Sequence, residues 1–407
     1  MKGIGSIMHF HFFKKRSVQL LAGTVGMMLM GIAYAWSLFV TPLEIALGWN
    51  RSQTSFVFTL SMIFNAVGMM LSGFLSKKTS HKVLMMTSAV LFGCGFFLSS
   101  LIKAPWQLNL SYGVLVGLAA GIGYNTITYT VNSWFEGRVG MSSGMLFMGF
   151  GSGSFLFAGL IDFLEKKIGW IGTFRTLAII MFFSLTTITF LLYLPGKVEK
   201  VSIASIDNNF ATSQMLRKKA FFSYYIWAVF IWSIGLSIIG NAAIVVTSIG
   251  GNNLTVIATG ILSVTNGLCR VILGRFYDRF GSRPTIFIVS VAMLASTLLF
   301  QLAFRINSIS LVMVALFSGG IGCGGIAPTN SAFIRDCFGH ENYASNFGMF
   351  GTFGIFASIA GSFVVGKLFA ISGTYSIAML PLFIYAVIAM CGQWLVPEQK
   401  KVLASSP

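Results

Sequence analysis

The chain has 407 residues, of which 56% are hydrophobic and only 9% are charged. A soluble domain has about 25% charged residues, and one this apolar would expose large hydrophobic patches. This composition excludes an ordinary soluble protein and indicates a protein embedded in a bilayer.

The net charge of +17 comes from 27 Lys and Arg against 10 Asp and Glu. In a soluble protein this excess would suggest nucleic acid as a partner. Here the bases form short clusters between apolar segments, such as Lys77, Lys78 and Lys82, which is typical of topology signals. We therefore expect no nucleic-acid partner.

The sequence predicts no metal site and no disulfide framework. None of the five cysteines has CxxC spacing, and they are interpreted as small buried hydrophobic residues. His9 and His11 are interpreted as residues of an N-terminal tail. No phosphate-binding loop is present, so we expect no cofactor and no ATP drive.

Hydropathy predicts twelve helical spans, because each crossing needs about 20 mostly apolar residues. The first apolar run is too long for a signal peptide and predicts a retained span. The predicted spans are 17–41, 53–76, 83–102, 106–134, 139–164, 172–195, 220–246, 254–277, 284–304, 307–334, 342–370 and 374–396.

The distribution of Lys and Arg predicts the orientation. With the N-terminus inside, 19 of these residues fall on the cytoplasmic side, seven on the other side, and Arg270 lies inside a span. The bias places both termini in the cytoplasm. We expect a multi-pass protein of the inner (plasma) membrane.

The chain divides into two similar halves. The polar segment 196–219 separates six spans on each side, which predicts bundles at 1–195 and 220–407 joined by a cytoplasmic central loop. Matching residues recur at offsets of 199 to 204. Examples are Gly73 with Gly274 and Gly144 with Gly348. This agreement favours a duplicated six-helix unit.

The loop Gly274–Arg283, GRFYDRFGSR, resembles the signature loop of the major facilitator superfamily, G-x-x-x-D-R-x-G-R-[KR]. The first-half copy has Lys77 where the acid is expected. The resemblance implies two six-helix bundles, a central cavity and alternating access. Asp278 is predicted to pair with a base or to cap a helix end, and Asp278, Arg279 and Arg283 are the candidate gating residues. The alternative interpretation is a topology signal only.

Finer features resemble the oxalate/formate antiporter and monocarboxylate transporter branch. They are YAWSLF at 34–39, GWNR at 48–51 and NGLCR at 266–270. This resemblance implies that Arg270 and aromatic residues bind the anion. Tyr34 and Tyr124 occupy matching positions.

Arg270 also has a physical interpretation of its own. Eight helical residues separate it from Asp278, which is about 12 Å of a hydrocarbon core whose half-thickness is about 15 Å. Burying this charge costs at least a few kcal/mol, and no predicted span has an acid near mid-depth. A mobile carboxylate fits the planar guanidinium. The alternatives are snorkelling or a bond to backbone carbonyls.

Other polar side chains follow the same helix faces and are candidate cavity residues. Asn266 lies one turn from Arg270, with Ser263 on the same face, and Asn125 shares a face with Tyr129 and Asn132. Such stripes more often hold helices together than bind a substrate.

Residues 347–361 of the eleventh span, FGMFGTFGIFASIAG, contain no base, whereas the oxalate antiporter has a lysine in this span. Phe350 and Phe353 are predicted as apolar cavity walls, or as packing residues. One fixed cation favours a monocarboxylate over oxalate.

These observations predict a secondary transporter of small organic anions that is not an enzyme. Its expected partners are a small carboxylate, lipid, and either protons or a counter-anion, and we expect a monomer. The alternatives are an exporter of drugs or other solutes, and a membrane sensor that does not transport.

Overall fold

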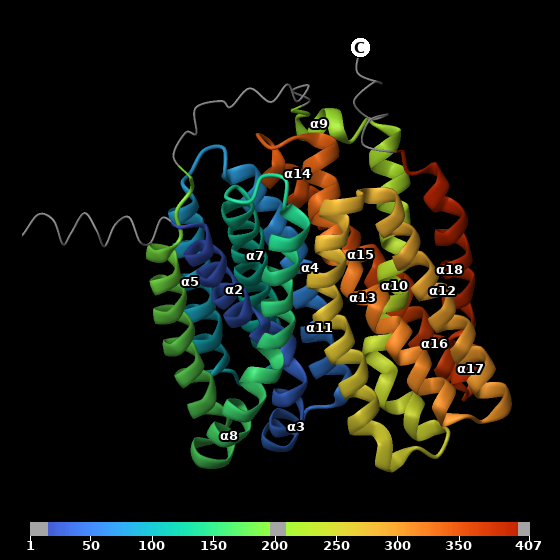
Figure 1. The fold of residues 1–407 in the computed structure, drawn as a ribbon. Helices are drawn as coiled ribbons and strands as arrows, with labels where there is room; N and C mark the ends of the chain where they lie inside the picture. Colours follow the sequence, from blue (N-terminus) through green and yellow to red (C-terminus); the bar gives the residue numbers. More distant parts are fainter. Residues whose placement is uncertain (1–14, 196–208, 398–407) are drawn as a thin grey trace, which may run out of the picture. The chain divides into compact units, whose positions relative to one another are not determined.

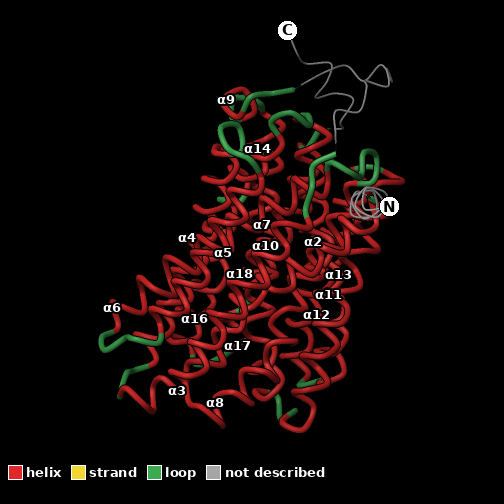
Figure 2. Tube along the Cα trace, turned by 90° about the vertical axis from the view of Figure 1, so that its left-hand side faces the viewer, coloured by secondary structure: helices red, strands yellow, loops and turns green. Residues whose placement is uncertain are grey.

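The computed structural model describes residues 15–195 and 209–397. This part of the chain consists of helices joined by short loops (Figure 2). The tail with His9 and His11, most of the predicted central loop, and Lys400 and Lys401 lie outside the described residues.

Eleven helical segments of the described chain are long and apolar enough to cross a bilayer. The number is one lower than the twelve predicted spans because α8 (Val139–Leu191) is counted as one segment. Within α8, Gly169 has the non-helical dihedrals φ 67° and ψ 176°. A straight helix of 53 residues would measure about 80 Å, more than twice the hydrocarbon thickness. The chain turns back within α8 (Figure 1), so this element contains the predicted fifth and sixth spans.

The chain forms two compact units that do not follow the sequence halves completely. Unit 1 comprises residues 1–136, 145–205 and 340–352, and unit 2 comprises residues 137–144, 206–339 and 353–407. Each half therefore contributes one short segment to the unit built mainly by the other half. The first turns of α8 belong to unit 2, and α14 (Tyr343–Phe350) belongs to unit 1.

Unit 1 contains most of the first-half elements. They are α2 (Arg16–Met30), η1 (Gly31–Ala35), α3 (Trp36–Leu47), α4 (Arg51–Leu75), α5 (His81–Ser99), α6 (Pro105–Leu108), the π-helical η2 (Asn109–Val116), α7 (Gly117–Asn132) and most of α8. Fully buried rings fill its core. Tyr112 packs on Trp36 with ring centroids 4.5 Å apart, and Phe39 stacks on Phe174 at 4.8 Å.

Unit 2 contains most of the second-half elements. They are α9 (Thr212–Met215), α10 (Lys219–Ser248), η3 (Asn252–Leu254), α11 (Thr255–Phe280), α12 (Ser282–Ile306), α13 (Ile309–Phe338), α15 (Phe353–Ser358), the π-helical η4 (Ile359–Phe363), α16 (Val364–Ser372), α17 (Tyr375–Ala378), α18 (Leu380–Gly392) and η5 (Gln393–Leu395). Two buried polar pairs lie in its core: the Tyr224 hydroxyl donates to Asn330, and the Trp227 indole donates to Ser290.

Two predicted spans are interrupted. The first changes from α-helix to a 3-10 segment at η1, which contains Tyr34, before α3 resumes the span. The eleventh is broken at Gly351 and Thr352, between Phe350 and Phe353. Broken spans are common at the substrate sites of transporters. The position of these breaks is therefore consistent with Tyr34, Phe350 and Phe353 as candidate site residues.

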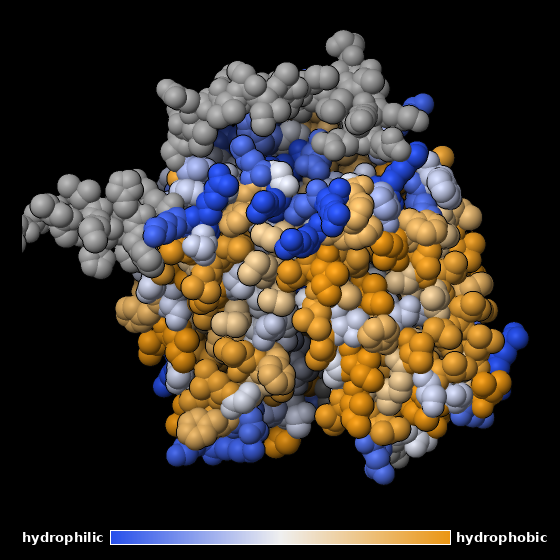
Figure 3. Space-filling model, viewed as in Figure 1, coloured by the Kyte–Doolittle hydropathy of each residue, from blue (hydrophilic) through white to orange (hydrophobic). Residues whose placement is uncertain are grey.

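Large hydrophobic side chains are exposed along the spans. Phe155 and Phe183 of α8 are 86% and 62% exposed, and Val264 of α11 is 61% exposed. In Figure 3 hydrophobic residues cover the middle of α8 and α11, and hydrophilic residues gather near helix ends. Such apolar helix exteriors fit contact with lipid.

Candidate functional site

Arg270 lies half-buried on α11, and its guanidinium is held by Asn266. The Arg270 Nε atom donates to Asn266 Oδ1 over 3.2 Å. The four-residue spacing brings the two side chains together on one helix face, as the sequence predicts. Ser263, one turn further along this face, is exposed.

The backbone of α11 is tightly packed at Arg270. A Cβ atom on Gly144 of α8 would meet the Arg270 carbonyl oxygen, and one on Gly324 of α13 would lie 2.6 Å from the Asn266 carbonyl oxygen. Only glycine allows these backbones to approach so closely. The helix carrying Arg270 is thus fixed from two sides within unit 2.

Tyr34 and Tyr124 belong to one aromatic cluster in unit 1. Phe150 contacts both rings edge-on, with centroid distances of 5.1 Å to each. Tyr124 also stacks parallel to Phe147 at 5.0 Å. The Tyr34 side chain is 39% exposed, so the cluster reaches an accessible surface.

Phe147 and Phe150 were not predicted as site residues. They lie three positions apart in the fifth predicted span, a spacing that places two rings on one helix face. This spacing is the only feature of the sequence that could have linked Phe147 to Phe150. It does not reveal that their helix face packs against Tyr124.

Asn125 is fully buried and joins three helices of unit 1. Its Nδ2 atom donates to the backbone oxygens of Met69 at 2.9 Å and Ala344 at 3.0 Å, and to Ser72 Oγ at 3.1 Å. These bonds connect α7 to α4 and α14. They favour the packing role that was the alternative to substrate binding.

The two predicted wall residues of the eleventh span differ in environment. Phe350 is fully buried at the end of α14, and Phe353 is half-buried at the start of α15. The buried position favours packing for Phe350. Phe353 stays a candidate wall residue.

Asp278 caps the helix that begins at Val139. One carboxylate oxygen accepts from the Gly140 backbone N–H at 2.7 Å, and the other accepts from the Met141 N–H at 2.8 Å. The first N–H groups of a helix lack partners within the helix, and its N-terminus attracts negative charge. Two roles were predicted for Asp278, pairing with a base or capping a helix end. In the structure its carboxylate caps the N-terminus of α8.

The cap accompanies a close helix contact that recurs in both halves. A Cβ on Gly274 of α11 would meet the Gly140 backbone, and one on Gly73 of α4 would meet the Ala344 backbone of α14. The repeated contact supports the duplicated unit inferred from the glycine offsets. Lys77 stands in the first-half position that corresponds to Asp278.

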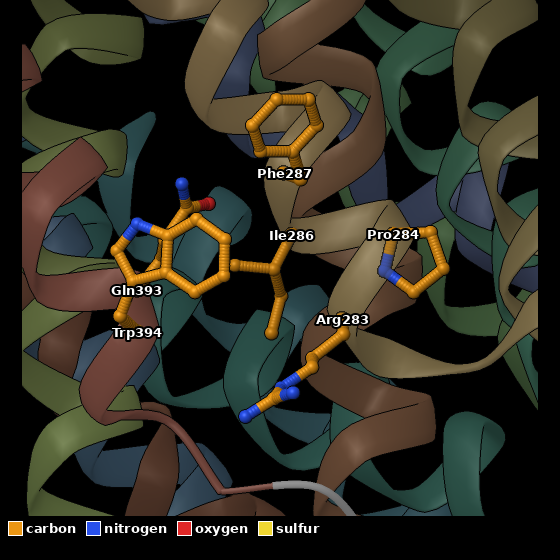
Figure 4. Close-up of a pocket in the computed structure, with 6 residues that line it drawn as sticks. All are labelled: Arg283, Pro284, Ile286, Phe287, Gln393 and Trp394. Atoms are coloured by element: carbon orange, nitrogen blue, oxygen red, sulfur yellow. The ribbon is translucent and has the colours of Figure 1, made fainter.

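The two predicted gating arginines lie in different surroundings. Arg279 is exposed, and its guanidinium carbon lies 5.1 Å from the Phe280 ring centroid. Arg283 is the second residue of α12 and lines a cavity with Gln393 and Trp394 (Figure 4).

A second acid lies close to the cap in unit 2 and was not singled out from the sequence. The Tyr277 hydroxyl, next to Asp278 in the chain, donates to the Asp336 carboxylate near the end of α13. No spacing rule links residues of α11 and α13, so this pair had no signal in the sequence.

Broken membrane spans and matching glycine contacts in the two halves are features that many secondary transporters share. The sequence matches the Major Facilitator Superfamily over residues 21–262 and 243–406. The chain belongs to this superfamily. It is therefore a multi-pass membrane transporter and not an enzyme.

Relatives and a solved structure agree with this assignment. The chain is 27% identical over 401 residues to the oxalate:formate antiporter of Oxalobacter formigenes, covering 95% of this chain and 94% of that protein. It is 26% identical over 136 residues to monocarboxylate transporter 12 of Mus musculus, covering 33% and 28%. A crystal structure of a double-tryptophan mutant of XylE shares the fold, with a TM-score of 0.76, 15% identity and coverage of 95% and 98%.

Proposed function

We propose that the protein is a secondary transporter of small monocarboxylates and that Arg270 binds the carboxylate. The observation that carries the proposal is the half-buried guanidinium in a membrane helix, held at Nε by Asn266. The name of the full-length relative, an oxalate:formate antiporter, supports carboxylates as the substrate class.

The geometry of Arg270 suggests how the anion is bound. Arginine stays ionised in proteins, and its guanidinium fits a carboxylate with two parallel hydrogen bonds. Asn266 engages the Nε side of the group. In this proposal the carboxylate binds the guanidinium, and Asn266 fixes the plane of the fork.

A single carboxylate is favoured over two. The eleventh span contributes Phe350 and Phe353 and has no base between residues 342 and 366. A second carboxylate would enter a low-dielectric site without a cation of its own, which is costly. Tyr34 and Tyr124 are retained as proposed binding residues.

Asp278 is proposed to act on the conformational equilibrium of alternating access. Its charge caps α8 away from Arg270 along α11, so it affects the population of one state more than the substrate contacts. Arg279 and Arg283 remain proposed gating residues. We place the protein in the plasma membrane with both termini in the cytoplasm, as the Lys and Arg bias predicts.

Transport by purified protein in proteoliposomes tests the function. A panel of radiolabelled carboxylates is offered with and without a pH gradient, and with and without anion inside. Saturable monocarboxylate uptake supports the proposal. Stimulation by the gradient then identifies proton symport, and stimulation by internal anion identifies exchange. Uptake of cationic drugs but of no carboxylate would favour the exporter, and binding without uptake would favour the sensor.

A further inference from the structure

A cavity at the start of α12 has a composition unlike that of the proposed transport site. It has a volume of about 210 Å³ and lies between the first turn of α12 and η5 of unit 2. Arg283, Pro284, Ile286 and Phe287 line it from α12, and Gln393 and Trp394 line it from η5 (Figure 4). One cation and one amide side chain therefore line the cavity among apolar and aromatic residues.

Gln393 contributes a buried polar side chain to the wall of the cavity. Its side chain is only 6% exposed, and its Nε2 atom contacts the Met390 sulfur at 3.1 Å. Its Oε1 atom is buried and has no hydrogen-bond partner among the described residues. A buried acceptor without a donor is costly, so a hydroxyl that enters the cavity would gain a hydrogen bond here.

The rim of the cavity is suited to the membrane interface. Trp394 is 67% exposed and Phe287 is 45% exposed, and both line the cavity together with the exposed Arg283. Tryptophan is enriched where lipid headgroups meet the hydrocarbon core, and basic residues there attract anionic headgroups. The cavity is smaller than the roughly 300–1,000 Å³ of sites that enclose a whole drug-sized ligand, which favours a headgroup whose chains stay in the bilayer.

We propose that this cavity binds the headgroup of an anionic phospholipid that carries a free hydroxyl, with phosphatidylglycerol as the matching chemistry. Its phosphate pairs with Arg283, and a glycerol hydroxyl donates to Gln393 Oε1. The acyl chains lie against Phe287 and Trp394. The site is distinct from Arg270 and does not depend on which solute is transported.

Native mass spectrometry of the full chain, titrated with phosphatidylglycerol or phosphatidylcholine of identical chains, tests the proposal. We expect tighter binding of phosphatidylglycerol at one site. Arg283→Gln should weaken phosphatidylglycerol binding about fivefold, because one basic residue near the membrane surface contributes about 1 kcal/mol. Gln393→Leu should also weaken this binding. The matched control is Arg305→Gln, which removes an exposed arginine from the opposite end of α12.

Three results would overturn the proposal. They are equal weakening by Arg305→Gln and Arg283→Gln, equal binding of the two lipids, and displacement of the lipid by inorganic phosphate at millimolar concentration. The last would identify a simple anion site.

A second measurement leaves the arginine and the glutamine in place. Phosphatidylglycerol with brominated chains should quench a component of tryptophan fluorescence that is missing in Trp394→Phe. Brominated phosphatidylcholine should quench this component less. Equal quenching by the two lipids would mean that Trp394 contacts bulk lipid only.

Discussion

The carboxylate of Asp278 lies 2.7 Å from the backbone nitrogen of Gly140, a residue 138 positions earlier in the chain. The bond joins α11 of the second half to the first turn of α8. Capping a helix with an acid contributes about 0.5–2 kcal/mol. A contact of this size is large enough to shift a conformational equilibrium several-fold.

Asp278→Asn should lower the maximal transport rate more than the substrate affinity. Asparagine keeps one acceptor but loses the charge and one of the two bonds to α8, so the equilibrium should shift by about 2- to 30-fold. Affinity and maximal rate are measured on the same preparation. Asp162→Asn, which alters an exposed acid paired with Lys166, is the control. A large affinity loss at normal maximal rate would contradict the assigned role.

Gly274→Ala should destabilise the contact between α11 and α8. The added methyl group would meet the Gly140 backbone, and overpacking of this kind costs about 1–3 kcal/mol. Gly260→Ala on the same helix has open space and is the matched control. We expect a lower thermal midpoint for Gly274→Ala alone. Equal midpoints would mean that the contact relaxes without cost.

Asn125→Leu should reduce stability without changing the apparent substrate affinity of the protein that folds. The substitution removes the hydrogen bonds from Nδ2 to Met69, Ser72 and Ala344, each worth about 0.5–1.5 kcal/mol. Thermal unfolding and transport kinetics are measured together. A normal midpoint with a raised KM would instead place Asn125 at the substrate.

Arg270→Lys should reduce transport by at least about tenfold while membrane insertion stays intact. Lysine keeps the charge but loses the planar fork and the bond to Asn266, and hydrogen bonds to charged groups are worth about 1.5–3 kcal/mol. Arg275→Lys, an exposed position five residues further along α11, is the control. Unchanged kinetics in Arg270→Lys would indicate snorkelling or a structural role.

The sequence predicted the features that depend on local composition. Long apolar runs gave the spans, and a four-residue spacing on one helix placed Arg270 beside Asn266. Contacts between distant segments had no such signal. The bond from Asp278 to Gly140, the three helices joined by Asn125, and the pair formed by Tyr277 and Asp336 depend on how helices pack. The reversal at Gly169 was expected only as a loop, because hydropathy does not report backbone dihedrals.

Competition between carboxylates on the purified parent protein tests the central claim, a site with one fixed cation at Arg270. Formate, lactate, pyruvate and oxalate each compete with a labelled monocarboxylate in proteoliposomes, and the same series is run on Phe353→Lys. We predict that monocarboxylates compete better than oxalate, and that Phe353→Lys improves oxalate relative to them if this side chain reaches the substrate. Clear preference of the parent protein for oxalate would contradict the account, because a second cationic group would then have to contact the bound anion.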